Sequence, residues 1–361
     1  MIASLNQSYS KARQAFLRAA TKAEARVESY PHPLLGLEGE ALFVDVAEVG
    51  APDATSLVIV VSGTHGVEGY LGSAFQRHHL EHLHLETLGE PRENVAFVFV
   101  HALNPYGFSW VRRVNEDNVD LNRNFIDWSQ PPPQNDDYGQ LRDTLVPGSW
   151  SDADQARTRI DLISKLTEFG FDRSQQIISG GQYDHPTGLF YGGTEPTWSH
   201  RWLRDFIQHR LATIERAAIL DIHTGLGPWS HAELISSAQP DSATLERQRS
   251  WWDHVTSIHE QSSVSAEIAG EWLGAVEAFA PNTELTGVAI EYGTVDTVLI
   301  LDSLRADAVL HASGMHTSPD AAAVRAQVRA AFIDDDPAWL QACWAQYAPV
   351  FNAATHQLGD T

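Results

Sequence analysis

The segment 57-LVIVVSGTHGVEG-69 joins a short apolar run to a glycine-rich turn that contains a histidine and a glutamate. The run at 57–61 is rich in β-branched residues and stops just before the first glycine, which is typical of a strand buried on both faces. His65 and Glu68 follow in the turn, three positions apart. Because zinc accepts imidazole nitrogen and carboxylate oxygen as ligands, this turn predicts two of the three protein ligands of a catalytic metal site.

Three further apolar runs have the same character as the first. They cover 95–100, 217–222 and 287–290, and polar residues and glycine follow each of them. The residues at 69–88 have helical spacing and no proline, so this part of the chain alternates strand, helix and strand. We expect an α/β fold with a mixed, mostly parallel sheet flanked by helices on both faces. Open sheets of this kind bind ligands at the carboxyl ends of their strands.

The composition argues against several classes of partner. The chain has 361 residues, with 47 acidic against 24 basic side chains and a net charge of −23. Such an excess repels nucleic acid and anionic lipid, and no Lys/Arg run reverses it locally. No stretch approaches the roughly 18 apolar residues of a membrane span, and residues 1–26 contain no apolar core of signal-peptide length. We therefore expect a cytoplasmic protein with no nucleic-acid or membrane partner.

A single catalytic domain is expected to span 1–361, because α/β hydrolases often keep one core at this length. Residues 129–155 begin with Ser-Gln-Pro-Pro-Pro-Gln-Asn-Asp-Asp, which predicts an irregular acidic, proline-rich surface insertion. Helical spacing returns at 156–169, and the alanine-rich segment from 306 onward predicts further helices. The one cysteine, Cys343, rules out an intramolecular disulfide, and its apolar context predicts packing.

The third metal ligand has to come from another strand end, and His223 is the candidate. It follows the run at 217–222 and precedes a glycine-containing loop. The period-2 alternation of a strand puts Asp221 on the same face, where it would orient the imidazole by a hydrogen bond. The alternative is a core histidine whose role is to pair with Asp221.

Glu291 directly follows the last of the four runs. A carboxylate at such a position is expensive to bury unless it is paired or hydrogen-bonded. Near a metal site it would serve as general base and then as proton donor to the leaving group. The alternative is an ordinary loop glutamate.

Three arginines stand out in a chain this acidic: Arg112, Arg113 and Arg123. The third has an asparagine on each side, and an arginine in that setting suits bidentate recognition of a carboxylate. Salt bridges to aspartates of the same segment are the structural alternative.

Together these motifs resemble the zinc carboxypeptidase superfamily, in the same order along the chain. The matching stretches are His65-Gly-Val-Glu68, Asn104-Pro-Tyr-Gly107, Asp120-Leu-Asn-Arg-Asn124, His223 and Glu291. The resemblance covers about 56–294 and is most similar to a bacterial branch of that superfamily. It extends to aspartoacylase and succinylglutamate desuccinylase-type deacylases.

The resemblance implies a role for each matching position. His65, Glu68 and His223 match the ligands of one zinc ion. Glu291 matches the catalytic glutamate.

The resemblance also implies groups that bind the substrate. Arg123 with Asn122 matches the pair that holds its terminal carboxylate, and Arg113 matches the arginine that stabilises the oxyanion, with Arg112 as a close rival. Digestive members carry a tyrosine between the third zinc ligand and the catalytic glutamate, and this chain has none in that interval. Tyr191, which precedes the third ligand, is the remaining candidate to line the pocket.

Three functions are compatible with these residues. The first is a zinc-dependent metallocarboxypeptidase that hydrolyses an amide bond adjacent to a free carboxylate, with a small peptide as substrate. The second is a zinc-dependent deacylase of small N-acyl amino acids. Such deacylases usually read His-Gly-Asn-Glu in the first motif, and Val67 at the third place here favours the peptidase. The third, outside the enzymes, is a metal-free carboxylate-binding protein on the same fold.

Overall fold

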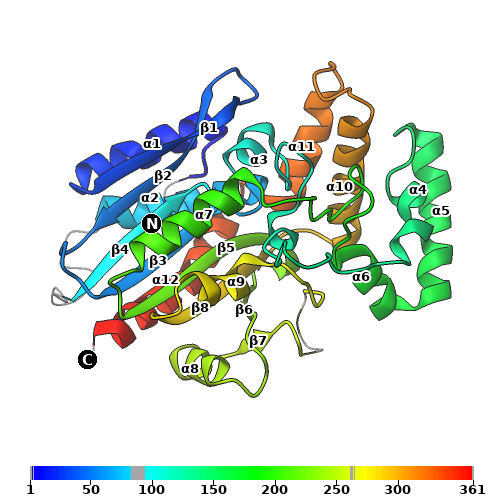
Figure 1. Cartoon of the computed structure of the whole chain (residues 1–361). Helices are drawn as coiled ribbons and strands as arrows, with labels where there is room; N and C mark the ends of the chain where they lie inside the picture. The colour runs from blue at the N-terminus through cyan, green and yellow to red at the C-terminus, as the bar shows by residue number, and fades with distance from the viewer. Residues whose placement is uncertain (1, 3, 83–93, 261–262, 264, 360–361) are drawn as a thin grey trace.

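The computed structural model describes residues 2, 4–82, 94–260, 263 and 265–359. Within them, eight strands form one sheet in the order β1-β2-β4-β3-β5-β8-β6-β7 (Figure 1). The strands are β1 (Arg26–Leu35), β2 (Ala41–Val49), β3 (Ser56–Ser62), β4 (Val95–His101), β5 (Arg216–Trp229), β6 (Ala232–Ser236), β7 (Val255–Ser257) and β8 (Glu284–Gly293).

Helices precede, connect and follow these strands. The longer ones are α1 (Tyr9–Lys22), α2 (Gly69–His82), α5 (Asp152–Phe169), α6 (Phe171–Ser179), α7 (Trp198–Arg210), α8 (Ala243–Trp251), α9 (Trp272–Phe279), α10 (Thr297–Ala312), α11 (Ala321–Phe332) and α12 (Pro337–Gly359). The shorter ones are η1 (Gly66–Glu68), α3 (Pro105–Trp110), η2 (Leu121–Arg123), η3 (Tyr138–Gln140) and α4 (Arg142–Leu145). None of the described helices is both long and apolar enough to cross a membrane.

The centre of the sheet is parallel. β4, β3, β5 and β8 lie side by side and run in the same direction. β1 and β2 add antiparallel strands beyond β4, while β6 is antiparallel to β8 and parallel to β7. The four apolar runs of the sequence are these four central strands, so the predicted fold class is confirmed.

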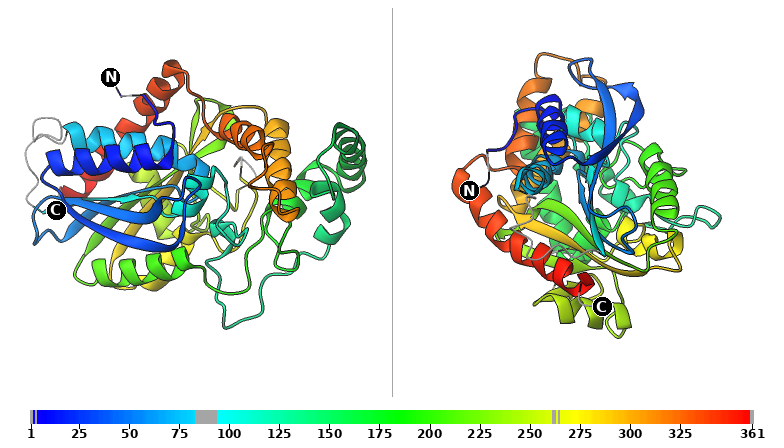
Figure 2. Two further views of the ribbon diagram at one scale, coloured as in Figure 1. Left: turned by 90° about the horizontal axis from the view of Figure 1, so that it is seen from above. Right: turned by 90° about the vertical axis from the view of Figure 1, so that its left-hand side faces the viewer.

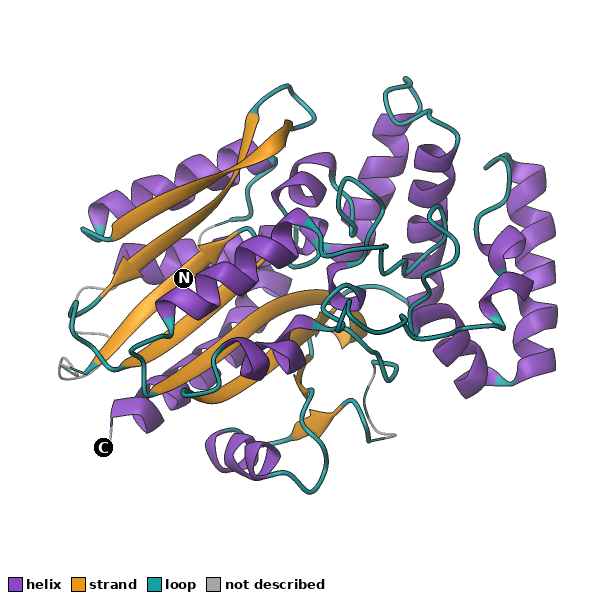
Figure 3. Ribbon diagram, in the orientation of Figure 1, coloured by secondary structure: helices purple, strands orange, loops and turns teal. Residues whose placement is uncertain are grey.

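Helices cover both faces of the sheet, which forms a single twisted layer in Figure 3. Val58 and Val60 of β3 pack into the core shared with α1, α2 and α12. The alternate residues Leu57, Ile59 and Val61 pack into the second core, with α7 and α9. The right-hand view of Figure 2 shows α12 and α7 on opposite sides of the sheet. Burial on both faces explains why β3 reads as an unbroken apolar run.

α4, α5 and α6 lie at one end of the molecule, beyond α10 (Figures 1 and 2). Arg305 of α10 reaches them and donates to the carbonyl oxygens of Thr144 and Leu145. α5 begins at Asp152, not at 156 as predicted, because the Ser151 side chain accepts a hydrogen bond from the backbone N–H of Asp154 and caps the helix.

The outer strands have no clear sequence signal. β1 contains two prolines and is exposed over most of its length, and β7 has only three residues.

The helix expected at 69–88 is present as α2 up to His82, and the remainder of that prediction lies outside the described residues. Cys343 is fully buried in the apolar core, as its context predicts.

The turn after β3 is held in place by a close backbone approach. Gly66 begins η1 and lies against Gly107 of α3, where a Cβ on Gly66 would overlap the carbonyl carbon of Gly107. The backbone N–H groups of Gly66 and Val67 donate to the carbonyl oxygens of Arg113 and Arg112, at 3.1 and 2.8 Å. The turn and the segment after α3 therefore form one rigid unit.

Gly66→Ala is expected to lower the free energy of unfolding by about 1–3 kcal/mol, because the added methyl group forces the two backbones apart. Gly148→Ala is the matched control, since a Cβ at Gly148 meets open space and should change stability by less than about 0.5 kcal/mol. Urea denaturation of both variants measures the difference. Equal stabilities would show that the close approach is not needed.

Candidate active site

Three ionisable side chains meet at the carboxyl edge of the central strands. His65 lies at the end of the turn after β3, Glu68 ends η1, and His223 lies on β5. The His65 Nδ1 atom is 3.0 Å from Glu68 Oε1, and the His223 Nδ1 atom is 2.9 Å from Glu68 Oε2. One ligand atom from each of the three lies within 4.8 Å of the others, so this group can hold a metal ion.

An aspartate contacts the Nε2 atom of each histidine. The Nε2 atom of His65 is 3.1 Å from Asp120 Oδ1, and the Nε2 atom of His223 is 2.6 Å from Asp221 Oδ2. This leaves both Nδ1 atoms directed at the centre of the group. Metal-ligating histidines typically have such a carboxylate on the second nitrogen, which orients the ring and increases its basicity.

Asp221 is itself fixed by neighbours. It accepts hydrogen bonds from Thr64 Oγ1 at 2.8 Å and from the indole N–H of Trp272 at 2.7 Å. The orienting contact between Asp221 and His223 agrees with the sequence prediction. Asp120 was predicted only as part of a motif, because the three-dimensional contact between its segment and His65 has no local signal.

The charges of the group balance one another. Burial alone would raise the pKa of Glu68, but His65 and His223 outweigh it and hold that pKa below its usual range. Burial alone would lower the pKa of His223, but Asp221 and Glu68 raise it well above its usual range. A proton on His223 therefore occupies the place that a cation would take. Metal binding has to displace that proton, since imidazole binds metals in its neutral form.

Glu291 faces the same group from β8. β5 and β8 are parallel and in register, with His223 directly paired with Glu291. The Glu291 Oε1 atom accepts a hydrogen bond from the backbone N–H of Leu226 at 2.9 Å. Burial and the nearby Glu68 raise the pKa of Glu291 to about 7, although His223, the Leu226 N–H and Arg113 act in the opposite direction. As a whole residue, Glu291 is less completely buried than His65, Glu68 and His223 beside it.

The two adjacent arginines point to different places. The guanidinium of Arg113 donates to Glu68 Oε1 at 3.0 Å and to Asp120 Oδ2 at 3.0 Å, so it lies at the edge of the group. Arg112 is buried and forms an ion pair of 2.9 Å with Asp307 of α10. Arg113 is therefore the one of the two that lies beside the candidate metal ligands.

Arg123 lies on the other side of Asp120 and is almost fully buried. Its Nε and Nη2 atoms donate to the carbonyl oxygen of Ser179, and Nη1 donates to the carbonyl oxygen of Asn122 at 3.1 Å. Three of the five guanidinium N–H groups thus have backbone acceptors. The Asn122 side chain accepts a bond from the backbone N–H of Trp272 at 3.4 Å.

Tyr191 contributes its backbone to the site. Its carbonyl oxygen accepts the backbone N–H of Asp120 at 2.8 Å, while burial and the nearby Asp117 raise the pKa of its phenol. Tyr292, next to Glu291, points into the opposite core, where its ring lies against Phe75.

A segment that carried no motif lies against the arginines. The ring of Phe190 is 5.5 Å from the Arg113 guanidinium carbon and 5.4 Å from that of Arg123. Phe190 has a φ of 52°, in the left-handed region that few bulky residues adopt. Such a conformation at a site of this kind is a common mark of function, and the sequence carried no signal for it.

The donor set fits a zinc ion. Two imidazole nitrogens and one carboxylate oxygen are the ligands of many catalytic zinc sites, which leave one position open. Buried aspartates hold both rings, and the ligand atoms already converge on one point.

Asp221→Asn is expected to weaken metal binding about 10- to 100-fold, because the amide cannot supply the charge that orients His223. Asp143→Asn, at an exposed position, is the control and should bind metal like the unchanged protein. Competition with a chromophoric chelator measures both affinities. An unchanged affinity in the first variant would contradict the orienting role of Asp221.

Comparison with known proteins places the chain in a family. Residues 5–346 match the model described as "Protein of unknown function (DUF2817)", so the chain belongs to that family. No curated protein sequence matches it.

Solved structures with a similar backbone include hydrolases. A carboxypeptidase A from Helicoverpa armigera is 14% identical, with 91% of this chain and 74% of that chain covered and a TM-score of 0.47. Bovine thrombin-activatable fibrinolysis inhibitor is 13% identical, with coverages of 90% and 96% and a TM-score of 0.45. A succinylglutamate desuccinylase from Silicibacter sp. is 12% identical, with coverages of 80% and 67% and a TM-score of 0.41.

Proposed function

We propose that this chain is a zinc-dependent metallocarboxypeptidase that hydrolyses an amide bond adjacent to a free carboxylate. The observation that supports it most is the in-register pair of His223 and Glu291, which sets a carboxyl group with a raised pKa beside three convergent metal ligands.

His65, Glu68 and His223 hold one zinc ion in this proposal. When bound, zinc supplies Lewis acidity and lowers the pKa of water. Glu291 accepts a proton from the attacking water and delivers it to the leaving amine. The Leu226 N–H fixes the Glu291 carboxyl group, so that one oxygen is oriented and the other is available for proton transfer.

The arginines act on the substrate. Arg113 faces the oxyanion that develops at the scissile carbonyl, and its bonds to Glu68 and Asp120 hold it in place. Arg123 with Asn122 holds the substrate carboxylate. The carbonyl oxygen of Ser179 accepts hydrogen bonds from the Nε and Nη2 atoms of Arg123, so the guanidinium is fixed before the substrate arrives.

The second candidate is a deacylase of small N-acyl amino acids, which uses the same groups. Val67, the residue that favoured a peptidase in the sequence, is fully buried in the apolar core. Its side chain therefore does not decide between the two substrates. The non-enzyme alternative, a carboxylate-binding protein without metal, leaves the position of Glu291 unexplained.

Glu291→Gln should keep one zinc per chain and lose about 10²- to 10⁴-fold in kcat/KM, which is the typical contribution of general base catalysis. Glu277→Gln, an exposed glutamate of α9, is the matched control and should retain full turnover. Elemental analysis and a panel of dipeptides and N-acyl amino acids measure metal and activity. Turnover retained in the Glu291 variant would overturn the assignment.

The pH profile should have an acid limb set by Glu291. A protonated carboxyl group cannot accept the proton of water, so kcat/KM should fall as the pH drops through its pKa. A bound cation favours the carboxylate, which places the midpoint below about 7 and above the ordinary glutamate value of about 4.3. Initial rates between pH 4 and 9 measure it. A midpoint above 7 would argue against Glu291 as the base.

A further inference from the structure

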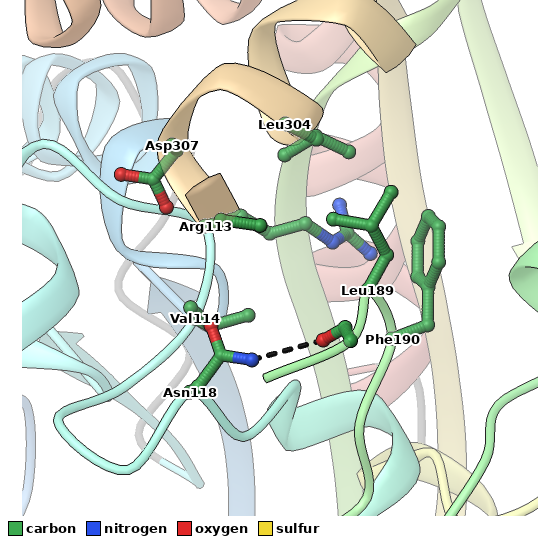
Figure 4. Close-up of a pocket in the computed structure, with 9 residues that line it drawn as sticks. Arg113, Val114, Asn118, Leu189, Phe190, Leu304 and Asp307 are labelled. Atoms are coloured by element: carbon green, nitrogen blue, oxygen red, sulfur yellow. Dashed lines mark hydrogen bonds between the residues drawn. The ribbon is translucent and has the colours of Figure 1, made fainter. Parts of the chain in front are cut away.

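The ring of Phe190 lies against both arginines that the proposed mechanism uses. The Arg113 guanidinium carbon is 5.5 Å from the centre of the ring, and that of Arg123 is 5.4 Å from it. Figure 4 shows the end of the Arg113 side chain directed towards the ring. Both distances are within the range of a cation–π contact, and such a contact is stronger where water is excluded. Both arginine side chains are largely buried, so this condition is met.

The two guanidiniums approach one carboxylate, that of Asp120. Arg113 Nε donates to Asp120 Oδ2 at 3.0 Å, whereas Arg123 Nη1 is 3.9 Å from Asp120 Oδ1. Burial lowers the pKa of Arg123, Asp120 acts against this, and the positive charge of Arg113 lowers that pKa further. Because the face of an aromatic ring is negative, Phe190 stabilises two positive charges that repel each other.

Hydrogen bonds fix the backbone of Phe190 and of its neighbours. The Phe190 carbonyl oxygen accepts from the backbone N–H of Gln182 at 3.2 Å, and the Gln182 side chain donates to the carbonyl oxygen of Leu189 at 3.3 Å. The carbonyl oxygen of Tyr191 accepts from the backbone N–H of Asp120 at 2.8 Å. The segment that carries the ring is therefore tied to the aspartate that both arginines approach.

The backbone conformation of Phe190 is unfavourable for a side chain of its kind. Its φ of 52° lies in the left-handed region, where glycine is the usual residue. Residues in such conformations persist where the surrounding structure holds them, and they are frequent at active sites. Because glycine would remove this cost, the contacts of the ring have to offset it.

We propose that Phe190 is a positioning residue, whose ring holds the Arg113 and Arg123 guanidiniums at the spacing between the scissile carbonyl and the terminal carboxylate of the substrate. The proposal rests on the proposed function. In such a substrate only the amide nitrogen and one carbon atom separate the two groups, so the distance between them varies little. Two arginines held at that distance orient the substrate without rearranging, and a misplaced arginine lowers the rate.

The experiment uses the zinc-loaded full chain with glycylalanine and N-acetylalanine, each as the free carboxylate and as the carboxamide. Phe190→Leu keeps an apolar side chain and loses the ring, so KM for the carboxylates should rise and kcat should fall, each by about 3- to 10-fold. KM rises because Arg123 binds the carboxylate in the ground state, and kcat falls because Arg113 acts on the oxyanion only in the transition state. With the carboxamides KM should change by less than about 2-fold, because the charge that Arg123 binds is absent.

Three further variants separate the ring from packing and from the backbone. Phe190→Gly also removes the ring and adopts the left-handed φ without cost, so it should give the same changes in a folded protein. Phe190→Tyr keeps the ring and should retain both constants within about 2-fold. Phe169→Leu is the matched control and should leave both constants unchanged, because the Phe169 ring also lies near two cations, Lys165 and Arg173, but at the end of α5. Circular dichroism and zinc content verify that each variant is folded and loaded.

Binding gives a second readout that does not need turnover. Calorimetric titration of the same four compounds into Glu291→Gln, alone and combined with Phe190→Leu, measures the ratio of affinities for carboxylate and carboxamide. This ratio should fall about 3- to 10-fold in the combined variant. A residue that only packs would change the temperature of unfolding and leave the ratio unchanged.

The outcomes separate the two proposals. Changes in both kcat and KM in the two variants without a ring, with none in Phe190→Tyr or in the control, support the positioning role. Turnover in which either constant stays within about 2-fold in the variants without a ring overturns that role and leaves the hydrolase intact. Binding without turnover in the unchanged protein overturns the hydrolase, while the ratio of affinities still decides the role of Phe190. No binding and no turnover with any of the four compounds overturns both.

Discussion

The parallel, in-register pairing of β3, β5 and β8 is the constraint on which the site depends. It places His223 opposite Glu291 and brings the turn after β3 to the same edge. The grouped charges are costly to bury, and breaking one partner of such a set typically costs several kcal/mol. The arrangement is tolerated because Asp120 and Asp221 satisfy the second nitrogen of each imidazole and Arg113 adds a positive charge. A one-residue slip of β8 would turn Glu291 to the opposite face and bury Tyr292 against the candidate metal ligands.

Much of the fold could be predicted because its central strands are buried on both faces. Such strands are continuous apolar runs, and their ends mark where functional side chains gather. The edge strands are different, since β1 is largely exposed and β7 contains only three residues. Their pairing comes from the neighbouring strand and not from their own composition. The start of α5 was missed by four residues because a serine cap, and not the apolar spacing, decides where that helix begins.

The side chains of the candidate site could be predicted where they lie at or just after the end of a buried strand. The candidate metal ligands and Glu291 are of this kind, and the structure brings them together. Arg112 and Arg113 could not be told apart in the sequence, because they are neighbours of the same type. They separate in the structure after α3 ends at Val111, which has a φ of 57°: Arg112 pairs with Asp307, and Arg113 pairs with Glu68 and Asp120. Phe190 and the carbonyl oxygen of Ser179 carry no motif, since their contacts with the arginines come from the segment after α6 and from the end of α6 itself.

The backbone contact between Gly66 and Gly107 has a consequence for how the sequence around the candidate site can vary. It joins the turn with two candidate metal ligands to the segment with Arg113, so an insertion in either would displace both. The two segments therefore form one unit, and we expect related chains to keep the length of both unchanged.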